Sequence, residues 1–272
     1  MPLNPLQRRV MATIAAQRNP ESYIAGGAAL HRRGIRDSHD IDIFNDREDI
    51  LDRAVAADAA ALAEAGFELT WERQTPSIHR ALVGAGVDAT RLEWVVDSEF
   101  RFFPVVPDPE FGFLLHPLDL AANKVLAAAG RFEARDAVDV LWVDKHIQPL
   151  GALAWAACEK DPGWMPEGIL TEIKFKSRYQ DYQLADLQLD QAITAAELNN
   201  RLRAVVARAE SLVAAIPRDL PYAALLRPNG SLAQPDPDRP ETLEGLVVHH
   251  GSRKGAWPSS PEIGSVMLRE RS

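Results

Sequence analysis

The spacing of apolar side chains divides the first hundred residues into short helices and strands. Leu6, Val10 and Ile14 recur at four-residue intervals, which predicts a helix from Pro5 to Gln17. An alanine-rich stretch from Arg47 to Ala65 predicts a second helix. Strands are predicted at Ser22–Ala25, Asp40–Phe44, Phe67–Arg73, Ile78–Val83 and Thr90–Asp97. We therefore expect an α/β (α+β) fold, with a small mixed sheet flanked by helices.

The pattern changes after residue 100. The stretch from Phe100 to Phe113 is punctuated by prolines and is predicted to be a loop. Helical periodicity covers Pro117 to Ala157, with breaks near Gly130 and Pro149, and returns from Ile193 to Ile216. The end of the chain is rich in Pro, Gly and Ser and has little periodicity. These changes predict a core over 1–115, a helical domain over 116–226, and a tail over 227–272 that is poorly ordered or depends on a partner.

Composition narrows the class of protein. The 272 residues carry a formal net charge of -9, which disfavours a protein that coats nucleic acid through a generally basic surface. The single cysteine, Cys158, rules out an internal disulfide and a cysteine zinc cluster. The chain shows neither a signal peptide nor an apolar run long enough to span a membrane. We expect a cytoplasmic protein with no membrane partner.

Gly26 and Gly27 directly follow the first predicted strand. Because glycine has no side chain, the backbone N–H groups at such a turn can approach phosphate oxygens closely. A plain strand-to-helix turn has the same sequence and is the commoner meaning of an isolated Gly-Gly pair.

Asp40 and Asp42 lie two residues apart on a predicted strand, separated by Ile41. Side chains at this spacing point to the same side of a strand, so both carboxylates could bind the same Mg²⁺ ions. A two-metal site stabilises the attacking and leaving oxygens of an in-line displacement. The alternative is a solvated strand face, but the apolar flanks favour a strand seated on a core.

Glu93 is the candidate for a third metal-binding carboxylate. It lies between Leu92 and Trp94 on another predicted strand, where an unpaired charge would be costly. A metal ion or a cationic partner would offset that cost. An outward-facing position on an alternating strand explains the residue almost as well.

Together these motifs resemble those of the AbiEii/AbiGii-type nucleotidyltransferase toxins, within the DNA-polymerase-beta-like nucleotidyltransferase superfamily. The resemblance runs from Tyr23 to Val143 and depends on the order and spacing of the motifs. The motifs are Gly26-Gly27-Ala28-Ala29-Leu30, Arg36-Asp37-Ser38-His39-Asp40-Ile41-Asp42-Ile43-Phe44, Asp119-Leu120-Ala121-Ala122-Asn123-Lys124-Val125-Leu126, and Arg135-Asp136-Ala137-Val138-Asp139-Val140.

The resemblance implies roles for further residues. Ser38 and Lys124 match positions that serve nucleotide binding and catalysis in that family. Arg36 could bind phosphate or cap the motif loop, and Asp136 could orient Lys124 or contact the nucleotide. Asp139 is expected to be structural, paired with Arg135. The helical domain would thus contribute Lys124 and Asp136 to the cleft of a catalytic core formed by 1–115.

The implied reaction is transfer of a nucleoside monophosphate from a triphosphate to an acceptor hydroxyl. Two Mg²⁺ ions, or Mn²⁺ in their place, would be held by Asp40, Asp42 and Glu93. The resemblance further implies a toxin with a cognate antitoxin and RNA such as tRNA as acceptor. Because the chain is acidic, such an RNA would have to bind at a local patch around Lys124, Arg131 and Arg135. Two alternatives stay open: a nucleotidyltransferase acting on a small molecule of the antibiotic type, and a catalytically retired fold that serves as a binding module.

Overall fold

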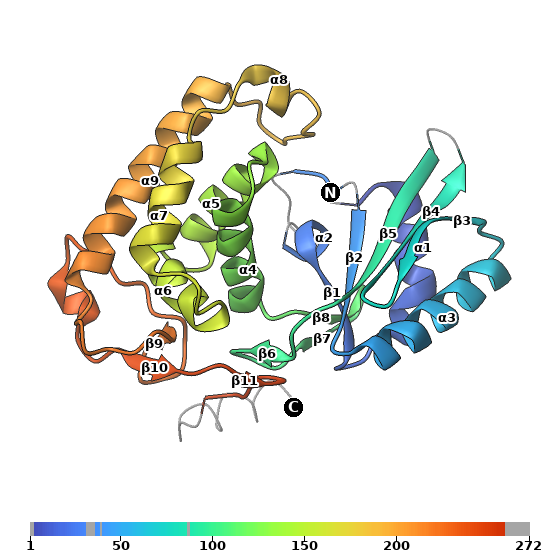
Figure 1. Cartoon of the computed structure of the whole chain (residues 1–272), viewed down its shortest axis with the longest axis horizontal. Coiled ribbons are helices and arrows are strands. Elements are labelled where there is room, and N and C mark those ends of the chain that lie inside the picture. Colours follow the sequence, from blue (N-terminus) through green and yellow to red (C-terminus); the bar gives the residue numbers. More distant parts are fainter. Residues whose placement is uncertain (1–2, 31–35, 39, 86–87, 259–272) are drawn as a thin grey trace. The chain divides into compact units, whose positions relative to one another are not determined.

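A computed structural model describes residues 3–30, 36–38, 40–85 and 88–258 of the chain (Figure 1). Residues 31–35, and His39 of the predicted motif from Arg36 to Phe44, lie outside these residues. The chain divides into two compact units, each described by itself below. Unit 1 contains Met1–Glu99, Pro104–Leu120 and Gln188–Gln191, and unit 2 contains Phe100–Phe103, Ala121–Leu187 and Ala192–Ser272.

Unit 1 is built on a seven-stranded mixed sheet of order β3-β4-β5-β2-β1-β8-β7 (Figure 1). The β2–β5 and β1–β8 pairs are parallel, and the other neighbours are antiparallel. The strands are β1 (Ser22–Ala25), β2 (Asp40–Asn45), β3 (Leu69–Thr75), β4 (Ile78–Ala85), β5 (Asp88–Val96), β7 (Val106–Asp108) and β8 (Gly112–Leu114). The predicted fold class is confirmed, although β7 and β8 lie where a loop was predicted.

The two faces of the sheet differ because side chains alternate along each strand. Ile41 and Ile43 of β2 are fully buried, as are Leu92 and Trp94 of β5. Two helices cover this apolar face, α1 (Pro5–Ile14) and α3 (Glu48–Glu64), which contact each other as well as β5. The intervening positions of β2 are only partly buried, so its carboxylates lie on the opposite face.

A buried ion pair lies on the apolar side of the sheet. Arg18 Nη2 donates to Asp58 Oδ1 at 2.5 Å, and both side chains are inaccessible to solvent. Trp94 Nε1 donates to the other carboxylate oxygen at 2.7 Å, and Arg18 Nη1 donates to Ser22 Oγ at 3.1 Å. Burial raises the pKa of Asp58, and the Arg18 charge and these hydrogen bonds oppose that rise. The network joins β1, α3 and β5 and so holds the central strands in place.

Unit 2 is mainly helical. Its longest helix, α9, begins at a capping box formed by Thr194 and Glu197 and packs against three neighbours, α5, α6 and α7. The helices are α4 (Pro117–Gly130, whose first turn belongs to unit 1), α5 (Ala134–His146), α6 (Leu150–Lys160), α7 (Pro166–Lys176), α8 (Asp181–Leu184) and α9 (Ala195–Ala215). None of the helices in the described part of the chain is both long and apolar enough to cross a membrane.

The first part of the predicted tail is organised by two short sheets in unit 2. Strand β10 (Val247–His249) pairs with β9 (Ala224–Leu226), and β11 (Ser252–Arg253) pairs with β6 (Phe100–Arg101). Residues 227–258 therefore include regular structure that the composition did not indicate, because their partners are distant in sequence. Residues 259–272 lie outside the described part. Dependence of this segment on a partner protein stays a prediction.

We expect Arg18→Met to lower the free energy of unfolding of unit 1 by about 3–5 kcal/mol, because it leaves the Asp58 charge buried without a cation. Urea denaturation followed by circular dichroism measures the change. The double variant Arg18→Met/Asp58→Leu should lose less than Arg18→Met alone. Arg53→Met, at an exposed ion pair with Asp49, is the control and should change stability by less than about 1 kcal/mol. A wild-type midpoint for Arg18→Met would contradict the assignment.

Candidate active site

Three of the predicted carboxylates share one face of the unit 1 sheet. Asp40 and Asp42 alternate with the buried isoleucines of β2. On the neighbouring parallel strand, Glu93 is the register partner of Asp42, and Arg91 is the partner of Asp40. Register partners on adjacent strands point to the same face of a sheet. Asp40, Asp42 and Glu93 therefore share one face of the sheet, and their use as metal ligands stays a prediction.

The Asp42 carboxylate lies against the glycine bend that follows β1. Gly26 has a φ of 66°. A β-carbon at Gly26 would lie 1.7 Å from Asp42 Oδ2, far closer than two such atoms can approach. Ala25, the residue before the bend, is also the register partner of Asp42. The bend thus requires glycine both for its backbone conformation and for the space that the carboxylate occupies.

Ser38 and Arg36 lie behind the second glycine. A β-carbon at Gly27 would lie 3.0 Å from both Arg36 Nη2 and Ser38 Oγ. Ser38 Oγ donates to the backbone oxygen of Asp40 at 2.8 Å, and Arg36 Nη1 donates to that of Asp37 at 3.1 Å. Both side chains are buried. The four predicted nucleotide-binding residues of unit 1 are thus brought together, with Ser38 and Arg36 supporting the motif loop.

Two contacts that hold the segment 36–38 were not predicted from the sequence. Gln7 of α1 donates from Nε2 to the backbone oxygen of Ser38 at 2.7 Å, and it is almost fully buried. From far along the chain, Gln188 accepts a hydrogen bond from the backbone N–H of Asp37 at 3.0 Å, and Leu189 forms a β-bridge with Arg36. A polar residue on the apolar face of a predicted helix was the signal for Gln7. No local signal pointed to 188–189.

Arginines neutralise the carboxylate face. Arg80 of β4 donates from Nε to Glu93 Oε2 at 2.5 Å, and its Nη2 contacts the same oxygen. Arg91 Nη1 lies 3.4 Å from Asp40 Oδ1, and its Nε donates to Glu72 at 3.0 Å. The hydrogen bond to Glu72, together with the charge of Asp40, raises the pKa of Arg91. Among the described residues, no group of three or more acidic, His or Cys side chains is placed so that it could hold a metal ion without rearrangement of their side chains or ion pairs.

Lys124 and Asp136 lie in unit 2, each in a different ion pair. Lys124 Nζ of α4 is 2.8 Å from Asp139 Oδ2 of α5, and the Asp139 side chain is fully buried. Asp136 is also fully buried and accepts from Arg131 Nε at 2.6 Å and Nη2 at 2.9 Å, which raises the pKa of Arg131. Asp139 thus pairs with Lys124, and the expected pairing of Asp139 with Arg135 stays a prediction. Asp139, which lies in the buried run 136–140 of α5, is the carboxylate that orients Lys124.

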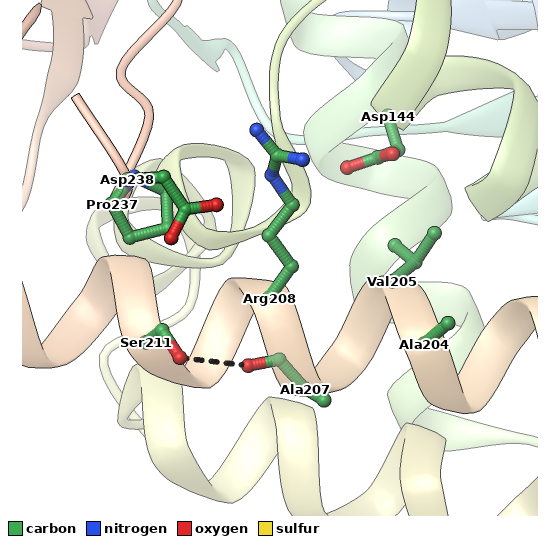
Figure 2. A pocket seen from close by; sticks show the side chains of 8 residues that line it. All are labelled: Asp144, Ala204, Val205, Ala207, Arg208, Ser211, Pro237 and Asp238. Carbon is green, nitrogen blue, oxygen red and sulfur yellow. Dashed lines mark hydrogen bonds between the residues drawn. The ribbon is translucent and has the colours of Figure 1, made fainter.

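A pocket in unit 2 contains none of the predicted site residues (Figure 2). Arg208 of α9 extends into it between Asp144 and Asp238 (Figure 2). Asp144 accepts from the backbone N–H of Leu150 at 2.8 Å, and burial raises its pKa. Arg208 itself is paired with Asp236 at 2.8 Å. The mixed charges of this pocket are largely satisfied internally, so the motif cluster of unit 1 is the better candidate site.

Comparisons with known proteins show a likeness of fold. No protein-family profile matches the chain, and no curated protein matches it. MenT4, a nucleotidyltransferase toxin from Mycobacterium tuberculosis, superposes with a TM-score of 0.52 at 13% identity, over 74% of this chain and 80% of its own. A protein from H. pylori described as a nucleotidyltransferase superposes with a TM-score of 0.49 at 18% identity, over 77% and 93%. The chain therefore has the fold seen in MenT4.

We expect Gly26→Ala to displace the Asp42 carboxylate and to weaken Mn²⁺ binding to unit 1 by at least about tenfold, measured by calorimetry. Gly66→Ala is the matched control, because Gly66 also has a positive φ, of 81°, but has open space around its α-carbon. Both variants should lose about 1 kcal/mol of stability through backbone strain. Only Gly26→Ala should lose the metal. Equal Mn²⁺ affinity in the two variants would show that the contact with Asp42 is unimportant.

Proposed function

We propose that the chain is a metal-dependent nucleotidyltransferase that moves a nucleoside monophosphate from a triphosphate to an acceptor hydroxyl and releases pyrophosphate. One observation carries the proposal: the Asp42 carboxylate fills the space left by Gly26, on the face that also bears Asp40 and Glu93. A site of this kind can hold a divalent ion and a polyphosphate side by side. The shared fold with MenT4 supports the same reaction class.

The donor set suits Mg²⁺, with Mn²⁺ as a substitute. All three candidate ligands are carboxylates, the hard oxygen ligands that Mg²⁺ prefers. Neighbouring strands place register partners such as Asp42 and Glu93 about 5 Å apart at their β-carbons, within reach of a shared ion. When bound, the two ions would supply Lewis-acid stabilisation of charge on the triphosphate and the attacking oxygen. For Glu93 to serve as the third ligand, the metal ion has to replace Arg80 as the partner of its carboxylate.

The glycine bend serves the triphosphate in this proposal. Gly26 and Gly27 leave the backbone open to phosphate oxygens, while Ser38 and Arg36 hold the loop from behind. In the transfer, a new bond forms between the acceptor oxygen and the α-phosphorus as the bond to pyrophosphate breaks. The acceptor hydroxyl gives up its proton to solvent water as this bond forms, and we assign Glu93 to the acceptor side of the site. Positioning and charge neutralisation then supply most of the rate enhancement.

We assign Lys124 and Asp136 to the same reaction on the basis of the motif resemblance alone. Lys124 is a compact cation suited to triphosphate oxygens, and Asp139 fixes its orientation. Asp136, bound by Arg131, keeps its assignment as a catalytic-site residue. Their contribution to the site of unit 1 is part of the proposal.

We further propose that the enzyme is the toxin of a toxin–antitoxin or phage-defence pair, of the AbiEii type, and that it modifies RNA such as tRNA in the cytoplasm. MenT4, which shares the fold, is described as a toxin. Expression of the chain should then arrest growth, and a cognate antitoxin protein should relieve the arrest.

We expect Asp40→Asn and Asp42→Asn each to lower transfer by about 100-fold or more, because each removes a metal ligand while keeping the shape of the side chain. The assay incubates the protein with each radiolabelled triphosphate, Mg²⁺ and total RNA, and follows the label into RNA. Asp52→Asn, at an exposed carboxylate of α3, is the control and should keep wild-type activity. Wild-type transfer by Asp42→Asn would refute the proposed site.

We expect Lys124→Gln to reduce transfer far more than Arg131→Gln. Each substitution removes the cation from a fully buried aspartate of α5, so the two variants should lose similar stability. Thermal denaturation checks that match, and the transfer assay then isolates the catalytic use of Lys124. Wild-type transfer by a folded Lys124→Gln protein would remove Lys124 from the site.

A further inference from the structure

A straight row of charged side chains crosses the carboxylate face of unit 1. Arg73 of the edge strand β3 is the register partner of Arg80, Arg80 is the partner of Glu93, and Glu93 is the partner of Asp42. Partners in register point to the same face, so the four side chains form one line from the sheet edge to the proposed metal site. Arg73 is exposed, and the Arg80 and Glu93 side chains are 34% and 21% exposed.

The two arginines of this row differ in their partners. Arg80 binds Glu93 Oε2 through both Nε and Nη2, so it occupies an oxygen that the proposed metal needs. Arg73 has no ion pair within the described part of the chain. A divalent ion bound at Asp42 and Glu93 would compete with Arg80 for this carboxylate and would also repel its guanidinium. Metal binding would therefore free Arg80 and leave two neighbouring arginines available to an anion.

We propose that Arg80 is a switch between metal and acceptor. It holds Glu93 while the metal is absent, and after metal binding it joins Arg73 in binding the phosphate backbone of a nucleic-acid acceptor. The inference rests on the metal site of the proposed function. Coupling between two binding sites is reciprocal. If the metal strengthens nucleic-acid binding by some factor, then the nucleic acid strengthens metal binding by that same factor.

The dimensions of the row favour a nucleic-acid strand over a small acceptor. Strands in a sheet lie about 4.8 Å apart, so three steps place Arg73 about 14 Å from Asp42. A chain of phosphates can contact Arg73 and Arg80 while its reacting hydroxyl lies at the carboxylates. The chain as a whole is acidic, so a nucleic acid needs such a local cationic path. In the predicted patch of unit 2, Lys124 is assigned to the triphosphate, and the Arg131 charge is offset by the buried Asp136.

Titration of the full chain with Mn²⁺ tests the first half of the switch. Arg80→Gln should bind Mn²⁺ about threefold to tenfold more tightly than wild type, because a competing cation is gone. Arg80→Lys, which keeps the charge but loses the two-nitrogen contact, should lie between them. Arg53→Gln, at an exposed ion pair on α3, should match wild type. Circular dichroism confirms that each variant is folded.

Fluorescence anisotropy with a labelled 12-nucleotide RNA, without triphosphate and at constant ionic strength, tests the second half. Mg²⁺ should strengthen RNA binding by wild type. Arg73→Gln and Arg80→Gln should each lower the slope of log affinity against log salt by about 1, and Arg53→Gln should leave that slope unchanged.

Unchanged Mn²⁺ affinity in Arg80→Gln, or an RNA affinity that is the same with and without Mg²⁺, would overturn the switch. Equal Mn²⁺ binding by wild type and Asp42→Asn would instead overturn the metal site and thus the proposed function.

Discussion

The contact between the Asp42 carboxylate and the backbone of Gly26 is the constraint on which the proposed site depends. It brings a carboxylate, a side chain of the type that binds metal ions, to a bend of the backbone where no side chain intervenes. The bend can take this form because Gly26 tolerates a positive φ, and Asp42 can reach it because β2 pairs with β1 in register. Ser38, held by Gln7 and by Asp40, fixes the loop that enters β2.

Negative charge is concentrated on the face of the sheet that bears Asp40, Asp42 and Glu93. Three carboxylates on adjacent strands repel one another, and Arg80 and Arg91 offset that repulsion. These arginines do more than stabilise the fold if metal ions bind where we propose, because the ions then take over the neutralising role. The charge balance of the face couples the occupancy of the metal site to the availability of cations beside it.

The apolar face of the same sheet contains a buried polar network. Arg18, Asp58 and Trp94 form a buried polar network in a region otherwise filled by isoleucine, leucine and alanine. Such a network is costly to bury and tolerates no missing member, which makes the packing of α3 on β5 specific. The strand that presents Glu93 on one face is thus anchored through Trp94 on the other.

Much of the fold could be read from local patterns. The two-residue period of β2 separates Asp40 and Asp42 from Ile41 and Ile43, and the structure keeps that separation. The glycines after β1 and the long helix over most of Ile193–Ile216 were also evident from the sequence. Strands β6 and β8 and the organised part of 227–258 were missed, because their residues become strands by pairing with distant segments. Strand β7 pairs only with nearby β8 and was missed because it is three residues long and contains Pro107.

The sequence by itself determined which residues could share a strand face and where a bend needed glycine, since both follow from local backbone geometry. Tertiary structure alone decided which cation meets which carboxylate. The pairing of Arg80 with Glu93 depends on strand order and register, and the pairing of Lys124 with Asp139 depends on how α4 and α5 pack. Neither is encoded in spacing along the chain, because ion pairs form between whichever side chains the packed backbone brings within about 4 Å.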